Sequence, residues 1–303
     1  MKGKVHADKA KIRRVILFIN PMKKYALELG EEIKAKMHYH GIETDTIKLK
    51  EKTKPDDIKG RYDIAFSLGG DGTVLSAARY MSPLGVPVFP VNLGTFGFIA
   101  GIQSSEWQEV FRLCQAGKAH ISRRLMLEIW VERKGGEILR GCCLNEVVIS
   151  SFGIAKIINL SVSLTEGRHK DIQKRKIFKL GSYRSDGLII STPTGSTAHS
   201  LAAGGPIMDP ELEALILNPI CPFALPSRPM VLPAEETVVI DVDRKQKSGV
   251  ILTIDGQVSE KLDNEDRIFL KKAPYYCFLI ASGRTGFYDT LAKKFVWAGG
   301  SKQ

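Results

Sequence analysis

A short glycine-rich segment with a single carboxylate follows an apolar run in the first quarter of this 303-residue chain. Its residues are Gly69, Gly70, Asp71, Gly72 and Thr73. Glycines let backbone N–H groups approach an anion closely, and a helix that begins here would point its positive end at the same place. Because a carboxylate repels phosphate, Asp71 would need a task there, such as holding a metal ion or accepting a proton from an attacking hydroxyl. The segment therefore indicates phosphoryl transfer.

Asp71 also has a structural interpretation, because Asp is favoured at the N-terminal cap of a helix. Residues 74–81 have the apolar spacing that such a helix requires. A cap does not need glycines on both sides, however, and Asp71 has them. We therefore favour a functional role for this carboxylate.

Further polar candidates lie in the second half of the chain. Asn145 and Glu146 interrupt an apolar strand pattern at residues 142–149. A charge inside a strand is costly unless it is paired or bound to a ligand, so this pair indicates a binding site. Asp186 stands before Gly187 and fits a turn as well as a site.

Hydroxyl side chains gather around Gly195, directly after an apolar run at residues 188–191. Such a cluster can cap a helix, or it can hydrogen-bond a ribose, a base or a phosphate, since each hydroxyl both donates and accepts. His199 is the only histidine near a candidate site. A second glycine-rich loop, at residues 92–98, fits a plain turn and a ligand loop equally well.

The elements that must position these residues fall into two groups. Strand and helix patterns alternate up to about residue 116, which predicts a parallel, Rossmann-like α/β domain with ligands at the carboxyl ends of its strands. From about residue 121, short β-branched runs split by turns predict a β-sandwich-like domain. Residues 287–295 return to helical spacing and predict a C-terminal helix that packs back on the first domain.

We place the domain limits accordingly. The α/β domain is expected to cover residues 1–110 and to be completed by residues 285–303, and the β-rich domain to cover residues 111–284. Residue 71 lies in the first domain, and residues 145, 146 and 186 lie in the second.

Composition narrows the class of protein. No apolar run is long enough to cross a bilayer, and no signal-type segment precedes residue 21, so we expect a cytoplasmic protein without a membrane partner. Five cysteines without a CxxC pair argue against a disulfide framework and a zinc site. The net charge of +11 fits either nucleic acid or anionic nucleotides. The basic run at residues 168–176 lacks base-stacking aromatics and is interpreted as a solvated loop.

Several blocks together resemble the NAD kinase family, in family order. They are residues 69–73, 92–98, 144–148, 186–198, 203–207, 219–222 and 227–229. The first block alone also resembles diacylglycerol kinases, sphingosine kinases and phosphofructokinases, so the combination carries the specificity. The resemblance implies transfer of the γ-phosphoryl group of ATP, or of a phosphoryl group from inorganic polyphosphate, to the 2′-hydroxyl of the adenosine ribose of NAD.

The resemblance also implies roles for individual residues. Asp71 would accept the proton of the attacking hydroxyl, and a divalent ion, expected to be Mg²⁺, would bridge the phosphates without a dedicated set of protein ligands. The residues implied for phosphate binding are Gly69, Gly70, Gly72 and Thr73. Asn145 and Glu146 would hold ribose hydroxyls. Asp186 and the turn at Thr197 would meet the adenine and nicotinamide ends.

Other substrate contacts are implied at the matching positions. They are Gly72, Phe98, Lys156, Arg184, Thr194, Ala198, His199, Ser200, Ala202 and Gln257. His199 stands where the family usually has Tyr, and Ala202 where it often has Ser. The resemblance also implies a homodimer or homotetramer in which Asp186 reaches the site of a neighbouring subunit. Small molecules are then the expected partners, and nucleic acid is not.

Two other functions fit part of this sequence. A lipid kinase of the diacylglycerol type shares the first glycine-rich block, but it would not predict the hydroxyl-rich turn or the pair Asn145 and Glu146. A non-catalytic protein that binds nucleotides or nucleic acid could use the net charge of +11, and it would not need Asp71 as a proton acceptor.

Overall fold

The computed structural model describes residues 12–49, 58, 60–94, 97–153, 156–165, 177–224, 226–281 and 286–295. The basic run at residues 168–176 therefore lies outside the described residues. The chain divides into two compact units, one of Met1–Arg123 with Cys277–Gln303 and the other of Arg124–Tyr276. The limit expected at residue 110 differs from this division and falls inside the helix α3 (Trp107–Gln115).

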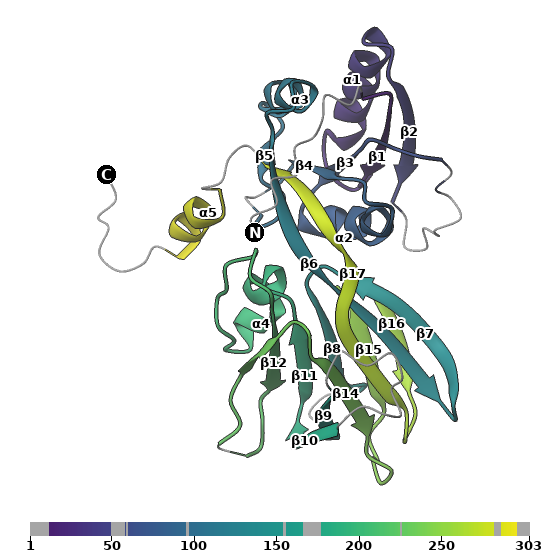
Figure 1. Ribbon diagram of the computed structural model, residues 1–303, viewed down its shortest axis with the longest axis vertical. Coiled ribbons are helices and arrows are strands. Elements are labelled where there is room, and N and C mark those ends of the chain that lie inside the picture. Colours follow the sequence, from purple (N-terminus) through teal and green to yellow (C-terminus); the bar gives the residue numbers. More distant parts are fainter. Residues whose placement is uncertain are drawn as a thin grey trace. The chain divides into compact units, whose positions relative to one another are not determined.

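The first unit is built on parallel strands. Its strands are β1 (Arg14–Ile19), β2 (Glu43–Lys48), β3 (Ile64–Gly69), β4 (Val88–Asn92) and β5 (Ile102–Gln103). They pair in the order β5-β4-β3-β1-β2, and all these pairs are parallel. Parallel strands need crossover connections, and the helices α1 (Ala26–Tyr39) and α2 (Asp71–Met81) provide them. The predicted α/β architecture is confirmed (Figure 1).

Helices cover both faces of this sheet, which explains why β1 is apolar at every interior position. Val15, Leu17 and Ile19 belong to one apolar cluster with residues of α1 and α3. Phe18 points to the opposite face, where its ring stacks on Tyr80 of α2 at a centroid distance of 6.3 Å. A strand buried on both sides cannot alternate between polar and apolar residues, and its sequence does not.

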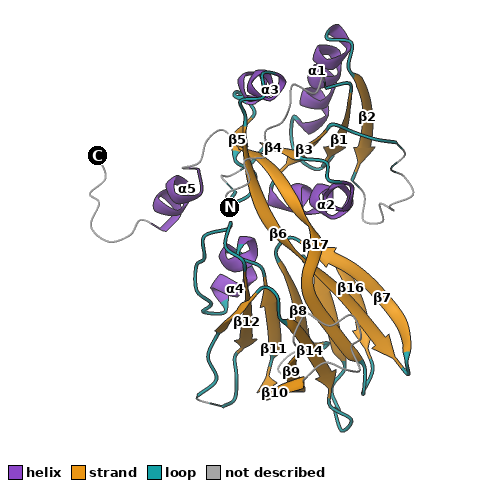
Figure 2. Ribbon diagram, viewed as in Figure 1, coloured by secondary structure: helices purple, strands orange, loops and turns teal. Residues whose placement is uncertain are grey.

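The second unit consists mainly of two antiparallel groups of strands (Figure 2). One group contains β6 (His120–Arg133), β7 (Gly136–Cys143), β9 (Ile158–Thr165), β10 (Ile177–Ser185), β14 (Thr237–Val242) and β17 (Arg267–Ala281). The other contains β8 (Glu146–Ser151), β11 (Gly187–Ser191), β12 (Ala214–Ile220), β13 (Met230–Pro233), β15 (Val250–Ile254) and β16 (Val258–Leu262). One buried apolar cluster takes residues from both groups, as a sandwich requires. The predicted β-rich domain is confirmed.

Short helical pieces complete the two units. A 3₁₀ turn, η2 (Ser82–Leu84), follows α2, while η4 (Thr194–Thr197) and α4 (His199–Ala202) follow β11. The C-terminal helix α5 (Gly286–Phe295) belongs to the first unit, and its Phe287 and Phe295 contact Phe98 there, with ring centroids 6.5 Å and 6.2 Å away. The helix thus packs on the first unit, as predicted.

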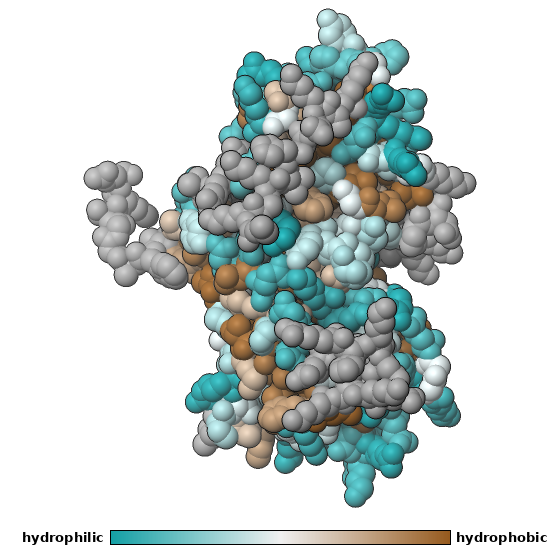
Figure 3. Space-filling model, viewed as in Figure 1, coloured by the Kyte–Doolittle hydropathy of each residue, from teal (hydrophilic) through white to brown (hydrophobic). Residues whose placement is uncertain are grey.

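Two further observations concern the length of the helices and the surface. Among the described helices, none is long and apolar enough to cross a membrane. On the face shown in Figure 3, hydrophobic residues lie in small groups among hydrophilic ones.

Candidate active site

The glycine-rich segment forms the turn between β3 and α2. Gly70 occupies the N-cap position with extended backbone, and Asp71 is the first residue of the helix. Gly69 has no room for a side chain, because a Cβ there would lie 2.1 Å from Oγ1 of Thr73. The helix therefore begins directly at the carboxyl end of β3, with its first N–H groups at the sheet edge where ligands bind.

Asp71 is not the cap, and its carboxylate has a different task. Its Oδ2 accepts the N–H of Phe98 at 2.9 Å, and its Oδ1 accepts the N–H groups of Ile99 and Ala100 at 3.2 and 2.9 Å. Gly97 lies so close that a Cβ there would be 2.0 Å from Oδ1. The described part of the second glycine-rich loop is thus a clamp that fixes the orientation of Asp71.

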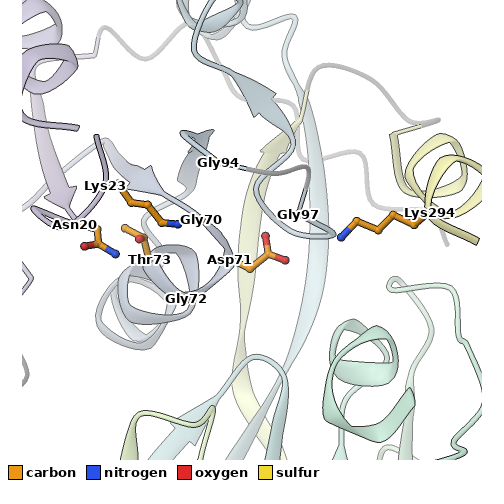
Figure 4. Close-up of a pocket in the computed structure, with 9 residues that line it drawn as sticks. All are labelled: Asn20, Lys23, Gly70, Asp71, Gly72, Thr73, Gly94, Gly97 and Lys294. Carbon is orange, nitrogen blue, oxygen red and sulfur yellow. The ribbon is translucent and has the colours of Figure 1, made fainter. Parts of the chain in front are cut away.

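A pocket of about 400 Å³ opens beside this carboxylate (Figure 4). Its lining residues are Asn20, Lys23, Gly70, Asp71, Gly72, Thr73, Gly94, Gly97 and Lys294. In Figure 4, Lys23 points toward the turn at Gly70 from one side, and the amino group of Lys294 points toward the loop at Gly97 from the other. Oγ1 of Thr73 is buried and lacks a hydrogen-bond partner in the described structure. The pocket combines two ammonium groups with the N-terminus of a helix and suits an anion.

Five lining residues were not among the predicted site residues. Gly94 and Gly97 belong to the second glycine-rich loop, whereas Asn20, Lys23 and Lys294 were missed entirely. Asn20 follows β1, and its Oδ1 accepts the N–H of Met22 at 3.0 Å. Lys23 lies in the same turn, and Lys294 lies in the last turn of α5 with its Nζ 4.3 Å from the centroid of the Phe98 ring. The position of residues 20–23 after a buried parallel strand was a usable signal. Nothing in the sequence connects Lys294 with residue 71.

In the second unit, Glu146 is the first residue of β8 and Asn145 directly precedes it, and both residues are buried, with 6% exposure for Asn145 and 7% for Glu146. Neither Oδ1 of Asn145 nor Oε2 of Glu146 has a hydrogen-bond partner in the described structure. Burial raises the pKa of the Glu146 carboxyl to about 8, and the charge of Asp255 adds to the increase. Buried polar atoms without partners are costly, so these two oxygens indicate a place for ligand hydroxyls.

The hydroxyl-rich turn lies beside this pair. Thr192 donates its hydroxyl to the carbonyl of Leu144 at 2.5 Å, and its N–H donates to the carbonyl of Asn145 at 2.8 Å. Gly195 lies so close to Asn145 that a Cβ at position 195 would be 2.3 Å from the backbone carbonyl oxygen of Asn145. Several hydroxyls therefore hold the turn in place, whereas Oγ1 of Thr194 is buried without a partner in the described structure. Neither η4 nor α4 has a side-chain cap hydrogen bond in the described structure, so these hydroxyls tie the turn to residues 144 and 145 instead of capping a helix. Ligand binding by the cluster stays a prediction.

Other substrate contacts implied by the resemblance lie in η4, in α4 and near Asp255. Thr197 donates its hydroxyl to the carbonyl of Thr194 at 3.3 Å, and Ala198 joins η4 to α4. Ser200 is fully buried, and its Oγ and carbonyl contact Nδ2 of Asn218 at 3.2 and 2.9 Å. His199 and Ala202 are exposed on α4. Gln257 is exposed two residues beyond Asp255, which contacts residues 144–146.

Three predicted site residues lie elsewhere in the same unit. Asp186 precedes β11 at the end opposite to Ser191, which pairs with Glu146. Five residues of strand separate these ends by about 16 Å. Lys156 follows the far end of β8, and Arg184 lies over the ring of Phe223, 4.6 Å from its centroid. The structure of one chain therefore does not bring Asp186 together with Glu146.

Comparisons with known proteins give a consistent answer. The model of the ATP-NAD kinase N-terminal domain matches residues 7–119, and that of the ATP-NAD kinase C-terminal domain matches residues 144–282. The NAD kinase of Treponema denticola is 38% identical over 290 residues, covering 96% of this chain and 98% of that protein. The NAD kinase of Geobacter sulfurreducens is 38% identical over 243 residues, covering 80% and 81%.

Solved structures share the fold. Yeast NADH kinase in complex with NADH has a TM-score of 0.84 at 22% identity, covering 98% of this chain and 93% of that one. An NAD kinase from Archaeoglobus fulgidus in complex with ATP has a TM-score of 0.68 at 21% identity, covering 93% and 98%. With both domain models matched in order and relatives aligned over most of its length, the chain belongs to the NAD kinase family.

Proposed function

We propose that this protein phosphorylates NAD at the 2′-hydroxyl of its adenosine ribose and produces NADP, with ATP or inorganic polyphosphate as the donor. Family membership supports NAD as the acceptor, and the ATP complex of the Archaeoglobus relative supports a nucleotide donor. One observation carries the proposal. Asp71 stands at the N-terminus of α2, fixed by three backbone N–H groups, in a pocket that also holds Lys23 and Lys294.

The donor phosphates would bind at the start of α2. The glycines at positions 69, 70 and 72 leave the backbone open to an anion, and Oγ1 of Thr73 offers a hydrogen bond that nothing in the described structure satisfies. Lys23 and Lys294 would balance the charge of the phosphate chain from two sides. The pocket thus supplies positive charge on either side of a single carboxylate.

Asp71 would act as the proton acceptor. As the 2′-oxygen attacks the terminal phosphorus, the new O–P bond forms while the bond to the bridging oxygen of the donor breaks, which leaves ADP or a shortened polyphosphate. The hydroxyl proton passes to Asp71. The clamp at residues 98–100 keeps the carboxylate in one orientation, so that reorientation costs little during the reaction.

A divalent ion, for which we propose Mg²⁺, fits this pocket as a companion of the phosphates. The described residues contain no cluster of three or more His, Cys, Asp or Glu side chains that could hold a metal. Mg²⁺ commonly binds through one carboxylate together with substrate phosphates and waters, and Asp71 is the carboxylate in the lining. When bound, the ion supplies neutralisation of phosphate charge.

The acceptor ribose would bind to the second unit. Oδ1 of Asn145 accepts a hydrogen bond from a hydroxyl, and Glu146, with its pKa at about 8, is protonated at neutral pH and can donate one as well as accept. Thr194 offers a third partner. We also propose that Arg184, Asp186 and Lys156 serve the site of a neighbouring subunit in a homodimer or homotetramer, because they lie at the far end of β11 and β8.

A further element of the proposal is a cytoplasmic location, which is supported by five free cysteine thiols.

The central test of the proposed activity is direct. The purified protein is incubated with NAD, Mg²⁺ and either ATP or polyphosphate, and NADP is measured with a dehydrogenase that accepts only NADP. We expect NADP with at least one donor. Phosphorylation of diacylglycerol with no NADP formed would overturn the proposal in favour of a lipid kinase.

A further inference from the structure

A second buried carboxylate, Asp255, contacts the pair that we assign to the ribose. Its Oδ1 accepts the N–H groups of Asn145 at 2.9 Å and Glu146 at 3.2 Å, and its Oδ2 accepts the N–H of Leu144 at 3.1 Å. The N–H of Asp255 donates in turn to the carbonyl of Glu146 at 3.0 Å. Only 6% of Asp255 is exposed. One side chain therefore accepts three successive backbone N–H groups at the start of β8.

Turn formation alone explains the presence of an Asp here, but not its burial. Asp255 and Gly256 have φ of +49° and +65°, and the N–H of Gln257 donates to the carbonyl of Ile254 at 2.9 Å. Positive φ at both central residues is what a type I′ turn requires, and Asp-Gly is a favoured sequence for it. The turn lies in the loop of residues 255–257 that joins β15 to β16. Such a turn needs the backbone conformation of the Asp, and its carboxylate is free to point into solvent. Here the carboxylate points to residues 144–146 instead.

The contact fixes the two groups that would bind the ribose. Residues 144 and 145 precede the first residue of β8, so the strand ladder does not determine the direction of their N–H groups. Asp255 gives these groups one common acceptor and thereby sets the backbone from which the side chains of Asn145 and Glu146 project. The free oxygens of those side chains, Oδ1 and Oε2, are the atoms that lack partners in the described structure.

We propose that Asp255 is a positioning residue for the acceptor: it orients Asn145 and Glu146 so that they bind the ribose hydroxyls. The inference rests on the proposed function of that pair. The same device occurs in the first unit, where the Asp71 carboxylate accepts the N–H groups of residues 98–100. In that case the carboxylate is itself the reacting group, whereas Asp255 acts through its neighbours.

The backbone conformation permits a clean deletion. Because φ at position 255 is positive, Asp255→Gly keeps the turn while it removes all three acceptor contacts. Asp255→Asn keeps one side-chain oxygen, enough for the N–H groups of Asn145 and Glu146. Lys134→Gly is the matched control, since Lys134 and Gly135 have φ of +50° and +80° in the exposed turn between β6 and β7. All three variants therefore test the side chain and not the turn.

Steady-state kinetics should then separate the substrates. We expect Asp255→Gly to raise the KM for NAD at least about tenfold, with the KM for the donor within about twofold of wild type. Asp255→Asn should fall between Asp255→Gly and wild type, and Lys134→Gly should match wild type. Equal kinetic constants for Asp255→Gly and Lys134→Gly would overturn the inference, as would equal increases in both KM values.

Two additional measurements keep the test decisive. Thermal melting identifies a variant that has not folded. If Asp255→Gly does not fold, the KM for NAD of Asp255→Asn compared with that of wild type decides the question. Affinity for NAD is also measured by calorimetry without a donor. If wild type binds NAD but makes no NADP, the proposed function fails, while weaker NAD binding by Asp255→Gly still supports the positioning role. If wild type does not bind NAD, both fail.

Discussion

Asp71 and Glu146 are both carboxyl residues, and their surroundings give them different chemistry. Asp71 accepts three backbone N–H groups and is partly exposed in a pocket, which suits a residue that must meet a substrate hydroxyl. Glu146 is buried with an oxygen that has no partner in the described structure, and its pKa is raised to about 8. Asp71 is suited to accept a proton from a substrate hydroxyl. Glu146 is suited to form a hydrogen bond with such a hydroxyl.

Replacement of Asp71 tests the proton acceptor. We expect Asp71→Asn to lower turnover by about 10² to 10⁴-fold, because general base catalysis is lost, while NAD affinity is largely retained. Asp63→Asn is the control, since the Asp63 carboxylate also accepts backbone N–H groups, those of Arg13 at 2.7 Å and Arg14 at 3.0 Å, but lies outside the pocket. An Asp71→Asn enzyme with wild-type turnover would exclude the assigned role.

The raised pKa of Glu146 predicts a pH-dependent stability. A carboxyl whose pKa rises from 4.5 in the unfolded chain to about 8 in the fold costs stability once it must ionise, mainly because it is buried and secondly because Asp255 is near. The stability that the neutral Glu146 carboxyl contributes to the fold is therefore complete below pH 4.5 and is lost as pH increases through about 8. Glu146→Gln cannot ionise, so its Tm relative to wild type should increase between pH 5 and pH 9. A Tm difference between Glu146→Gln and wild type that stays constant from pH 5 to pH 9 would contradict the raised pKa of Glu146.

The two pocket lysines are expected to act on the donor. Lys23→Met and Lys294→Met should each raise the KM for ATP by about 3 to 30-fold, the range of a charge-assisted hydrogen bond in a partly solvated pocket. The KM for NAD should not change. Lys24→Met is the control, because Lys24 is the neighbour in sequence and its Nζ lies over the ring of Tyr25, 4.8 Å from the centroid. A similar increase in that variant would mean that the effect comes from net charge alone.

At the scale of elements, the loop that clamps Asp71 should be as important as Asp71. A Cβ at Gly97 would lie 2.0 Å from Oδ1, so Gly97→Ala must displace either the carboxylate or the loop. We expect turnover to decrease about 100-fold with little change in Tm, since a misplaced catalytic group loses rate before the fold loses stability. Gly101→Ala provides the comparison, because a Cβ at Gly101 has no neighbour within 4 Å in the described structure. Equal activity of the two variants would show that the clamp tolerates the displacement.

Local patterns predicted the elements that obey them. The strand, turn and helix at residues 64–81 are evident from apolar spacing and glycine, and Asn145 and Glu146 stand out because they break a strand pattern. Asn is favoured at the N-cap of a helix and Pro in its first turn, so residues 20 and 21 alone would predict a helix start there. The helix α1 begins at Ala26 instead, after Tyr25 with φ of +64°. The intervening turn is what brings Lys23 into the pocket.

Residues that satisfy a local role could not be recognised as part of the site. Asp255 is an ordinary turn residue, and Lys294 an ordinary polar residue of a helix, until the fold brings them to partners far away in the chain. The pairing of β15 with β8 joins residues about a hundred positions apart, and periodicity within one segment carries no information on such a partner. Sequence reasoning therefore identified the residues that conflict with their local pattern and missed those that agree with it.

At the scale of the whole molecule, the net charge of +11 suits substrates that are anions. A positive field raises the encounter rate with ATP, polyphosphate and NAD, and salt weakens it. The same charge favours no particular oligomer. In one chain, β11 separates Asp186 from Ser191 and hence from Glu146. If Asp186 contacts substrate, a neighbouring subunit is the direct way to bring it there.

Mixed oligomers test this arrangement. Asp71→Asn removes the proton acceptor of its own chain, and Asp186→Ala removes the group that we expect to act in the neighbour. Each variant alone should have low activity. If the two are co-expressed, a mixed dimer has one site that combines an intact Asp71 with an intact Asp186, so activity should recover to about one quarter of wild type with random pairing. Without exchange of Asp186 between subunits, the mixture can only average its two parents. The recovered fraction therefore measures whether the substrate site is completed by the partner.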